Sequence, residues 1–238
     1  MLLKFIGTSD GYPEKDRKCS CTILTINGRH YVIDAGYSLY TALVQNDMLP
    51  QDVAAVFITH MHGDHSSGLI EYIAHMKWGR RHQLSTDIFL PSQKGKLALE
   101  ALAEIMDPGK DVDLKVYSEG VIYSDDNVKV TAYRTLHGAE TFGFLVEAEG
   151  KRIYFTGDMK GDITDMPAFV YEEKTDIIIC ESAHNKLFEI AHKLNKMRAN
   201  RIIINHIAKK HSVDDFEKCK PLITKPFDLA YDGMVVSL

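Results

Sequence analysis

Short apolar runs alternate with amphipathic segments along this chain. Apolar runs of about four to eight residues between turn residues predict strands, and apolar residues that recur every three or four positions predict helices. By these criteria we expect strands at residues 2–6, 21–26, 30–33, 53–58, 87–91, 112–117, 128–135, 141–148, 152–156, 177–180, 202–204 and 228–237. We expect helices at residues 39–44, 68–78, 96–106, 184–197 and 213–222.

Two turns carry residues that are typical of tight hairpins. Asn27-Gly28 and Glu149-Gly150 each separate two alternating strands, and this pattern predicts β-hairpins. Strand groups alternate with helices in both halves, and buried strands need helices over their faces. No solenoid repeat, low-complexity tract or Pro/Ser-rich linker interrupts the sequence. We therefore expect an α/β fold with sheets between helical layers, within a single domain of residues 1–238.

Composition and charge narrow the class of protein. Hydrophobic residues make up 45% of the 238 positions and charged residues 26%, which is ordinary for a globular protein. The net charge of −5 argues against a general nucleic-acid coat. No apolar run has the length of a membrane span, so no membrane partner is expected, and residues 1–7 are too short for a signal peptide. The four cysteines show no paired framework, which favours a cytoplasmic location.

A cluster of metal-ligating side chains follows the strand predicted at residues 53–58. His60, His62, Asp64 and His65 fall within six positions. Imidazole nitrogens and carboxylate oxygens suit zinc, manganese or iron. Because His60 and His62 are two residues apart, they can point the same way from an extended loop, whereas Asp64 and His65 come one turn later. The cluster therefore predicts a site for two metal ions.

Three later residues repeat this arrangement of an apolar strand that ends in a metal-type side chain. His137 follows the strand at 128–135, Asp158 follows 152–156, and His206 follows 202–204. Each residue alone is more often structural than ligating. Their order after the first cluster makes them candidate ligands as a set.

The motif His60-x-His62-x-Asp64-His65 resembles the signature of the metallo-β-lactamase superfamily, and the three later positions match its later motifs. The resemblance implies an αββα sandwich of two mixed β-sheets flanked by helices, with the metal site at one edge between the sheets. It implies the following ligands: His60, His62 and His137 for one metal, Asp64, His65 and His206 for the other, with Asp158 bridging and Asp34 in a supporting position behind them. The alternative for Asp34 is a turn-forming aspartate.

Two metal ions close together lower the pKa of a shared water to about 7, and a bridging hydroxide makes hydrolysis the expected reaction. The bridging position holds Asp158, whereas many true β-lactamases have cysteine there. The aspartate is similar to the phosphodiesterase and thioesterase branches. The resemblance implies two divalent ions, with zinc and manganese as the main candidates and iron as a third.

Three features resemble the ribonuclease Z and small phosphodiesterase branch. Residues 7–13, with Arg17 after them, are similar to the opening of that group, and residues 137–144 are similar to its third motif. Glu181 and His184 fall where the group places a further Glu and His. Asp64 and His184 are the candidate catalytic residues. His184 is predicted to open the helix at 184–197 and to act as a general acid or phosphate ligand, with capping of the helix as the alternative.

The segment between the third and fourth motifs sets this chain apart from ribonuclease Z. That family inserts a long tRNA-binding arm there, whereas only a hairpin at 141–156 separates His137 from Asp158. A small or cyclic phosphodiester is therefore the favoured substrate, and nucleic acid is disfavoured as a partner.

Several alternatives stay open. A thioesterase or lactonase of the glyoxalase II type, a metal-retaining binding module and an RNA 3′-processing nuclease share the ligand set. The family is often dimeric, so a homodimer is a further expectation. We interpret the four cysteines as packing residues, with an extra metal on Cys19 and Cys21 as the alternative. The basic groups at 77–81 and 209–211 are interpreted as solvated faces.

Overall fold

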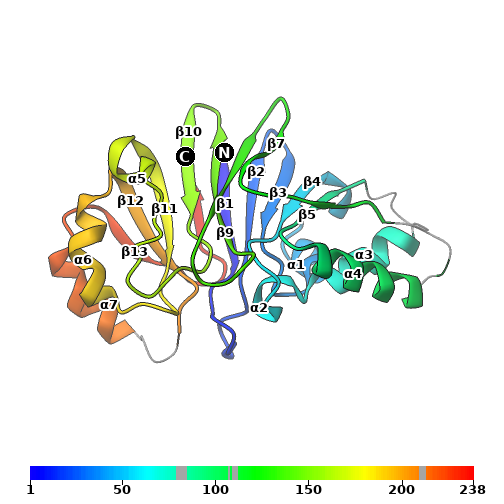
Figure 1. Ribbon diagram of the computed structural model, residues 1–238, viewed down its shortest axis with the longest axis horizontal. Coiled ribbons are helices and arrows are strands. Elements are labelled where there is room, and N and C mark those ends of the chain that lie inside the picture. The colour runs from blue at the N-terminus through cyan, green and yellow to red at the C-terminus, as the bar shows by residue number, and fades with distance from the viewer. Residues whose placement is uncertain (79–84, 107, 109–111, 209–212) are drawn as a thin grey trace. The chain divides into compact units, whose positions relative to one another are not determined.

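The computed structural model describes residues 1–78, 85–106, 108, 112–208 and 213–238. The basic residues at 80–81 and 209–211 lie outside this range. The chain divides into two compact units (Figure 1), of which the first comprises Met1–Gly7, Lys15–Tyr117 and Asp232–Leu238 and the second comprises Thr8–Glu14 and Ser118–Tyr231. Each unit contains a seven-stranded sheet and its own helices. A single domain of residues 1–238 stays a prediction.

The sheet of the first unit has the strand order β14-β1-β2-β3-β4-β5-β6. The strands are β1 (Leu2–Gly7), β2 (Cys21–Ile26), β3 (Arg29–Ile33), β4 (Val53–Phe57), β5 (Asp87–Leu90), β6 (Leu114–Val116) and β14 (Val235–Ser237). Pairing is antiparallel from β14 to β3 and parallel from β3 to β6. Asn27 and Gly28 have φ of 49° and 75°, which matches the twist of a tight hairpin and confirms the predicted turn.

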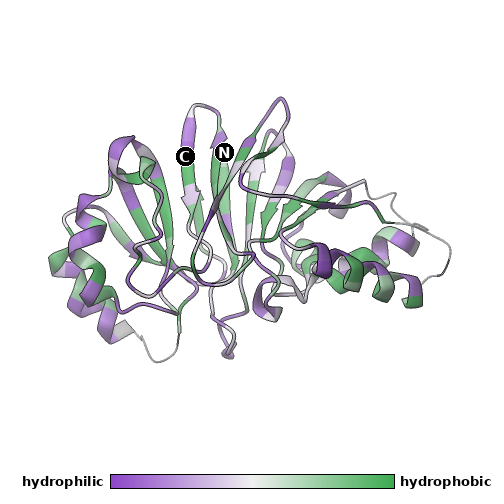
Figure 2. Ribbon diagram, viewed as in Figure 1, coloured by the Kyte–Doolittle hydropathy of each residue, from purple (hydrophilic) through white to green (hydrophobic). Residues whose placement is uncertain are grey.

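The helices of the first unit are α1 (Leu39–Gln45), α2 (Gly63–Ser66), α3 (Leu69–Trp78) and α4 (Gln93–Met106), with a 3₁₀ turn η1 (Pro50–Asp52). Figure 2 shows that the central strands are hydrophobic and that the helices carry mixed faces. The buried residues of α1, α3 and α4 form one core with the strands. α4 begins three residues before the predicted start at residue 96. Ser92 explains the difference, because its hydroxyl accepts the N–H of Gly95 at 3.3 Å and caps the first turn.

The sheet of the second unit has the order β13-β12-β11-β10-β9-β8-β7. Its strands are β7 (Gly120–Ser124), β8 (Lys129–Arg134), β9 (Phe142–Ala148), β10 (Lys151–Phe155), β11 (Thr175–Glu181), β12 (Ala199–Asn205) and β13 (Phe227–Leu229). Pairing is antiparallel from β7 to β10 and parallel from β10 to β13. The hairpin of β9 and β10 turns at Glu149 and Gly150, both with positive φ, as predicted. β7 was not predicted, because its apolar run is limited to residues 121–123; none of the residues of this edge strand is buried.

The helices of the second unit are α5 (Phe169–Glu172), α6 (Leu187–Lys196) and α7 (Val213–Cys219), followed by the 3₁₀ turn η3 (Lys220–Leu222). They pack with the strands in a second core. Two predictions here are wrong. α6 begins at Leu187 and not at His184. The single strand predicted at 228–237 is two strands in different sheets, because the chain turns between them through Gly233, whose φ is 89°.

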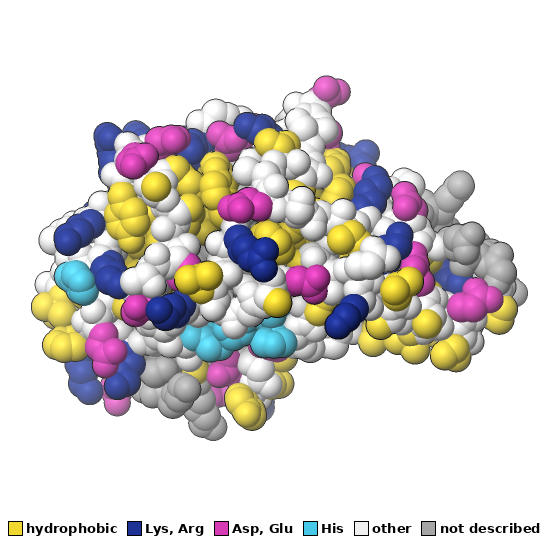
Figure 3. All heavy atoms as spheres, in the orientation of Figure 1, with side chains coloured by type: hydrophobic (Ala, Val, Ile, Leu, Met, Phe, Trp, Pro, Cys, Tyr) yellow, Lys and Arg dark blue, Asp and Glu magenta, His cyan; other side chains and the backbone are white. Residues whose placement is uncertain are grey.

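Side chains at the surface and in the cores test two further expectations. Cys21, Cys180 and Cys219 are buried in the two cores and Cys19 is half-buried, which confirms packing roles for the three buried cysteines. Figure 3 shows hydrophobic side chains exposed over the helices of the first unit. On α4, Leu97 is 56% and Ile105 is 78% exposed. A homodimer stays a prediction. None of the described helices is both long and apolar enough to cross a membrane.

Candidate metal centre

The histidine motif of the first unit lies where its central parallel strands end. β3 is followed by Asp34, and β4 is followed by Ile58, Thr59 and His60. Because parallel strands end at the same edge of a sheet, side chains that are distant in sequence meet there. Asp34 also has φ of 59°, a left-handed conformation that aspartate tolerates better than most residues.

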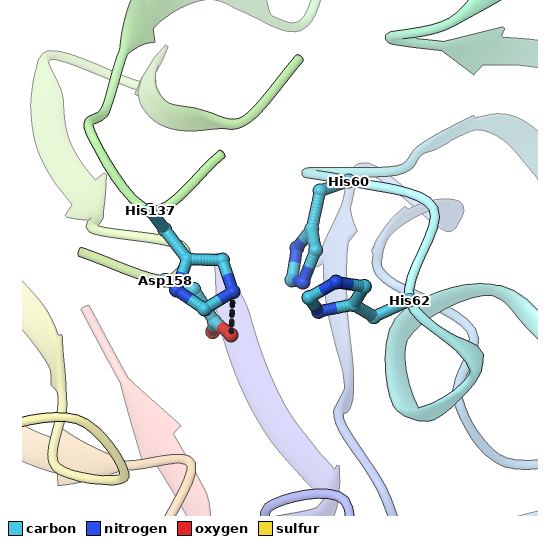
Figure 4. Close-up of side chains that lie close together, drawn as sticks. All are labelled: His60, His62, His137 and Asp158. Carbon is cyan, nitrogen blue, oxygen red and sulfur yellow. Dashed lines mark ion pairs between the residues drawn. The ribbon is translucent and has the colours of Figure 1, made fainter. Parts of the chain in front are cut away.

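The ligand-type side chains of this motif converge within the unit. Figure 4 shows His60 and His62 on the loop after β4, and their ring centroids are 4.5 Å apart. The rings of His60 and His65 are 4.1 Å apart. Asp64 and His65 lie on α2, a four-residue helix inside the motif that was not predicted. His65 Nε2 is 3.5 Å from Asp64 Oδ2, so these two donor atoms are close enough to share one ion.

Asp34 holds the motif through its carboxylate. Its Oδ2 accepts a hydrogen bond from His65 Nδ1 at 2.7 Å, and its Oδ1 accepts the Thr59 N–H at 2.8 Å. The Thr59 hydroxyl donates to Oδ1 at 2.9 Å and lies 3.2 Å from His60 Nδ1. A carboxylate only accepts hydrogen bonds, so Nδ1 of His65 carries the ring proton and Nε2 presents its lone pair. This is the arrangement that a metal-ligating histidine requires.

Gly36 allows the segment after β3 to lie against α2. A Cβ at this position would be 1.7 Å from the Asp64 carbonyl oxygen. Next to this contact, the Ala35 N–H donates a hydrogen bond to the His65 carbonyl oxygen at 2.7 Å and so joins the segment after β3 to α2. The backbone around Asp34 and the backbone of the motif are thus packed with no room for a side chain.

Replacing Gly36 with alanine is expected to lower the free energy of unfolding by about 1–3 kcal/mol, the usual cost of forcing an extra group into a packed site. Thermal unfolding of the metal-free protein measures this effect. Gly63→Ala is the matched control, because no atom lies within 4 Å of a Cβ at that position, and its change should stay within about 0.5 kcal/mol. Equal melting temperatures for the two variants would contradict the close packing.

The second unit contains its own cluster after the ends of β8, β10, β11 and β12. Asp158, His184 and His206 each offer one donor atom, and these atoms lie within 4.8 Å of one another. His206 Nε2 is 3.4 Å from Asp158 Oδ1. His137 Nε2 is 3.7 Å from Asp158 Oδ2, as the dashed line in Figure 4 marks. Asp158 is 98% buried, and a buried carboxylate among histidines is a typical metal ligand.

Polar residues outside the predicted site hold His137 and Asp158 in place. The Thr135 hydroxyl donates to the Asp158 carbonyl oxygen at 2.7 Å. The Thr141 hydroxyl accepts the N–H of Gly138 at 3.1 Å. These threonines fix the backbone on both sides of the site, and their role depends on contacts between strands that the sequence pattern does not reveal.

Glu181, which the resemblance placed beside His184 without assigning it a role in the site, contacts His184. Its Oε1 is 3.4 Å from His184 Nδ1, and its Oε2 accepts the N–H of His184 at 3.0 Å. Burial alone raises the pKa of Glu181, but the hydrogen bond and charge of His184 together with the charge of His206 outweigh it and bring the pKa below its usual value. Glu181 therefore orients His184 as an ionised carboxylate.

The position of His184 corrects the prediction that it opens a helix. It lies three residues before the start of α6, because the Glu181 carboxylate holds its N–H in a tight turn. The expected assistance from a helix N-terminus therefore does not apply to His184. Its ring lies 3.8 Å from Asp158 Oδ2 and keeps 35% exposure, so it remains next to the candidate ligands and accessible to a substrate.

A cavity of about 470 Å³ in the second unit opens beside His184. Its walls come from the turn at Gly161 and Asp162 and from α6 with the residues before it. A Cβ on Gly161 would be 2.6 Å from the His184 carbonyl oxygen, so the two walls touch at that point. Lys193 also donates to the carbonyl oxygen of Asp162. These contacts join the two walls at two points.

A family model described as "Anti-Pycsar protein Apyc1" matches residues 1–220. Among curated proteins, Ribonuclease Z of Pseudomonas putida (strain GB-1) is 36% identical over 124 residues, which cover 44% of this chain and 39% of that protein. Ribonuclease Z of Bacillus subtilis (strain 168) is 27% identical over 180 residues, which cover 73% of this chain and 57% of that protein. The chain thus spans about half the length of these curated relatives.

Solved structures show the fold. The metallo-β-lactamase fold protein YhfI from Bacillus subtilis has a TM-score of 0.80 at 15% identity, with 99% of each chain covered. The short form of human tRNase Z has a TM-score of 0.76 at 21% identity, with 100% of this chain and 99% of that chain covered. A diphosphatase from the PhnP family has a TM-score of 0.74 at 15% identity, with 100% and 97% covered.

These likenesses confirm the predicted fold class of two mixed sheets flanked by helices. They also confirm the predicted resemblance to the superfamily that contains the ribonuclease Z branch. Because the family model matches nearly all of the sequence, the chain is a metallo-β-lactamase superfamily protein that belongs to the anti-Pycsar protein Apyc1 family.

Proposed function

We propose that this protein is a dinuclear metal-dependent phosphodiesterase that cleaves a small or cyclic phosphodiester. His60, His62 and His137 would hold one divalent ion, and Asp64, His65 and His206 would hold the other, with Asp158 as a ligand shared by both. Zinc and manganese are the main candidate ions. The observation that carries the proposal is the presence of a convergent His/Asp cluster in each unit.

The donor set fits divalent metal ions. It consists of neutral imidazoles and carboxylates, which are the ligands that zinc and manganese share. The hydrogen bond between Asp34 and His65 Nδ1 also supports metal binding, because it fixes the tautomer that presents Nε2. When bound, two ions would lower the pKa of a coordinated water and offset the charge that develops on a phosphate.

The residues of the chain then supply proton transfer. His184 lies beside Asp158 and is oriented by Glu181, so its ring is placed to donate a proton to the oxygen of the leaving alkoxide. Glu181 stabilises the protonated imidazole that performs this step. Asp64 is the second candidate catalytic residue, through its place as a ligand beside His65.

The size of the site supports a small substrate. His137 and Asp158 are separated only by the hairpin of β9 and β10, which leaves no segment for a tRNA-binding arm. The cavity beside His184 has a volume of about 470 Å³, which is within the range of about 300–1,000 Å³ typical of small-molecule sites. A small phosphate ester that contacts His184 has this cavity beside it.

The first experiment is hydrolysis of bis(p-nitrophenyl) phosphate by metal-stripped protein that is reloaded with zinc or with manganese. Metal-dependent release of p-nitrophenol supports the proposal and leads to a panel of cyclic and linear nucleotide diesters. Absence of turnover with either metal contradicts a phosphodiesterase. Thioesters and lactones then test the acyl hydrolase alternative, and metal retention without turnover of any ester favours a binding module.

Nucleic-acid processing is the competing function, since the curated relatives are named Ribonuclease Z. Cleavage of a precursor tRNA at its 3′ end, compared with a cyclic nucleotide at equal concentration, separates the two. Preference for the precursor tRNA would overturn the small-substrate proposal.

Replacing His184 with alanine is expected to lower turnover of a 3′,5′-cyclic nucleotide by about 10²–10⁴-fold, which is the usual contribution of a general acid. Turnover of bis(p-nitrophenyl) phosphate should fall much less, because p-nitrophenolate leaves without protonation. Steady-state rates for both substrates measure the difference. His75→Ala is the control, a histidine of α3 that stacks on Tyr40. Equal losses for both substrates would reject the general-acid role.

A further inference from the structure

A buried tyrosine directly after β6 reaches the start of the histidine motif. Tyr117 is 8% exposed. Its hydroxyl donates a hydrogen bond to the Ile58 carbonyl oxygen at 2.7 Å and lies 3.5 Å from the Thr59 carbonyl oxygen. Burial, with a further effect from the charge of Asp34, raises the pKa of Tyr117 well above its usual value. The phenol is therefore a permanent hydrogen-bond donor at neutral pH.

Ile58 is the residue at which the chain leaves the sheet. Its N–H still donates to the Phe89 carbonyl oxygen at 3.0 Å, as in a strand. The next N–H, that of Thr59, donates to the side chain of Asp34 instead. A buried carbonyl at such a strand end needs a donor, and Tyr117 supplies one. Two side chains thus fix residues 58 and 59. The Tyr117 hydroxyl contacts their carbonyl oxygens, and the Asp34 carboxylate accepts hydrogen bonds from the N–H and the hydroxyl of Thr59.

We propose that Tyr117 is a positioning residue for the metal centre, which sets the direction of the backbone immediately before His60. The hydroxyl of Thr59 lies 3.2 Å from His60 Nδ1 and 3.3 Å from His65 Nδ1. A shift of the backbone at Thr59 therefore moves both histidine rings. Metal affinity depends on the placement of such supporting groups as well as on the ligands themselves. The inference rests on the metal centre proposed above.

The chain offers a matched pair of tyrosines to test this role. Tyr72 of α3 is also fully buried, and its hydroxyl donates to the Pro50 carbonyl oxygen at 3.1 Å and lies 2.6 Å from the Thr86 hydroxyl. Tyr117→Phe and Tyr72→Phe each remove one buried hydroxyl and keep the ring. Of these two hydroxyls, that of Tyr117 contacts the residues directly before His60, whereas the contacts of the Tyr72 hydroxyl are with Pro50 and Thr86.

The experiment measures zinc and manganese affinity by competition with a chromophoric chelator, beside thermal unfolding of the metal-free proteins. Both variants are expected to melt below the wild type by similar amounts. Tyr117→Phe is expected to weaken metal binding by about tenfold, the lower end of the effect of supporting partners, whereas Tyr72→Phe should stay within about twofold of the wild type.

Two outcomes would overturn the proposal in different ways. Wild-type metal affinity in Tyr117→Phe, or equal weakening in both variants, would reject the positioning role and leave the metal centre in place. A wild-type protein that binds neither zinc nor manganese would reject the metal centre, and the role of Tyr117 with it.

Discussion

Asp158→Ala is expected to reduce metal-dependent hydrolysis of bis(p-nitrophenyl) phosphate by about 10³-fold or more. Asp158 is the buried carboxylate that lies close to His137, His184 and His206, and it is the proposed bridge between the ions. Loss of Asp158 removes a negative charge from the ligand set and so weakens the hold on the metal. A metal ion supplies several kcal/mol of transition-state stabilisation. A loss of about 4 kcal/mol lowers the rate by 10³-fold. Initial rates with saturating zinc or manganese measure the effect.

The control for this variant is Asp126→Ala, which removes an exposed aspartate of the same unit. It should retain turnover within about twofold, as expected for a surface position away from the site. Metal content by elemental analysis shows whether Asp158→Ala has lost one ion or both. Full metal content with undiminished turnover would reject Asp158 as a ligand.

Asp34→Asn is expected to weaken metal binding by about 10–100-fold, the range found for partners of metal-ligating histidines. The carboxylate of Asp34 accepts hydrogen bonds from His65 Nδ1 and from the N–H and hydroxyl of Thr59. An amide of the same shape no longer carries the charge that favours the Nδ1–H tautomer. Its NH₂ group can donate to Nδ1 instead and place the ring proton on Nε2, which then cannot ligate a metal.

Asp47→Asn provides a close match for this substitution. Asp47 is exposed and also has a left-handed backbone, with φ of 55° against 59° for Asp34. Chelator competition with both variants separates the role of the carboxylate from any effect of the backbone conformation. Wild-type affinity in Asp34→Asn would show that Asp34 serves as a turn former and does not support the metal.

The sequence predicts those parts of the fold that depend on local patterns. β4 is an apolar run that is buried throughout, so its end, and the histidines after it, could be placed from the sequence. The two hairpin turns carry Asn-Gly and Glu-Gly, and the positive φ values of Asn27, Gly28 and Gly150 follow from residue type, whereas that of Glu149 is imposed by the turn. The sequence also predicts that histidines and carboxylates lie close together within each unit. Metal-type side chains at the ends of parallel strands meet at the same edge of the sheet.

Other features depend on contacts between distant parts of the chain. α2 is too short to show a helical period, and its Gly63–Ser66 segment contains no apolar residue. His184 was predicted to open an amphipathic helix, yet the carboxylate of Glu181 holds its N–H three residues before the helix begins. The hydrogen bond of Tyr117 to Ile58 joins residues 59 positions apart, and nothing in the local sequence around either residue marks it.

The pairing of β14 with β1 has a consequence for folding during synthesis. Leu3 is opposite Val236 in this antiparallel pair, so one edge of the first sheet comes from segments that are far apart along the chain. Most of the second unit is a continuous stretch, Ser118–Tyr231, and its strands are neighbours in the sheet in the order of the chain, so that β7 to β12 are synthesised well before β14. Because pairs of distant segments form slowly and structure tends to form as the chain emerges, we expect β7 to β12 to acquire protection from hydrogen exchange while the outer edge of β1 still awaits its partner.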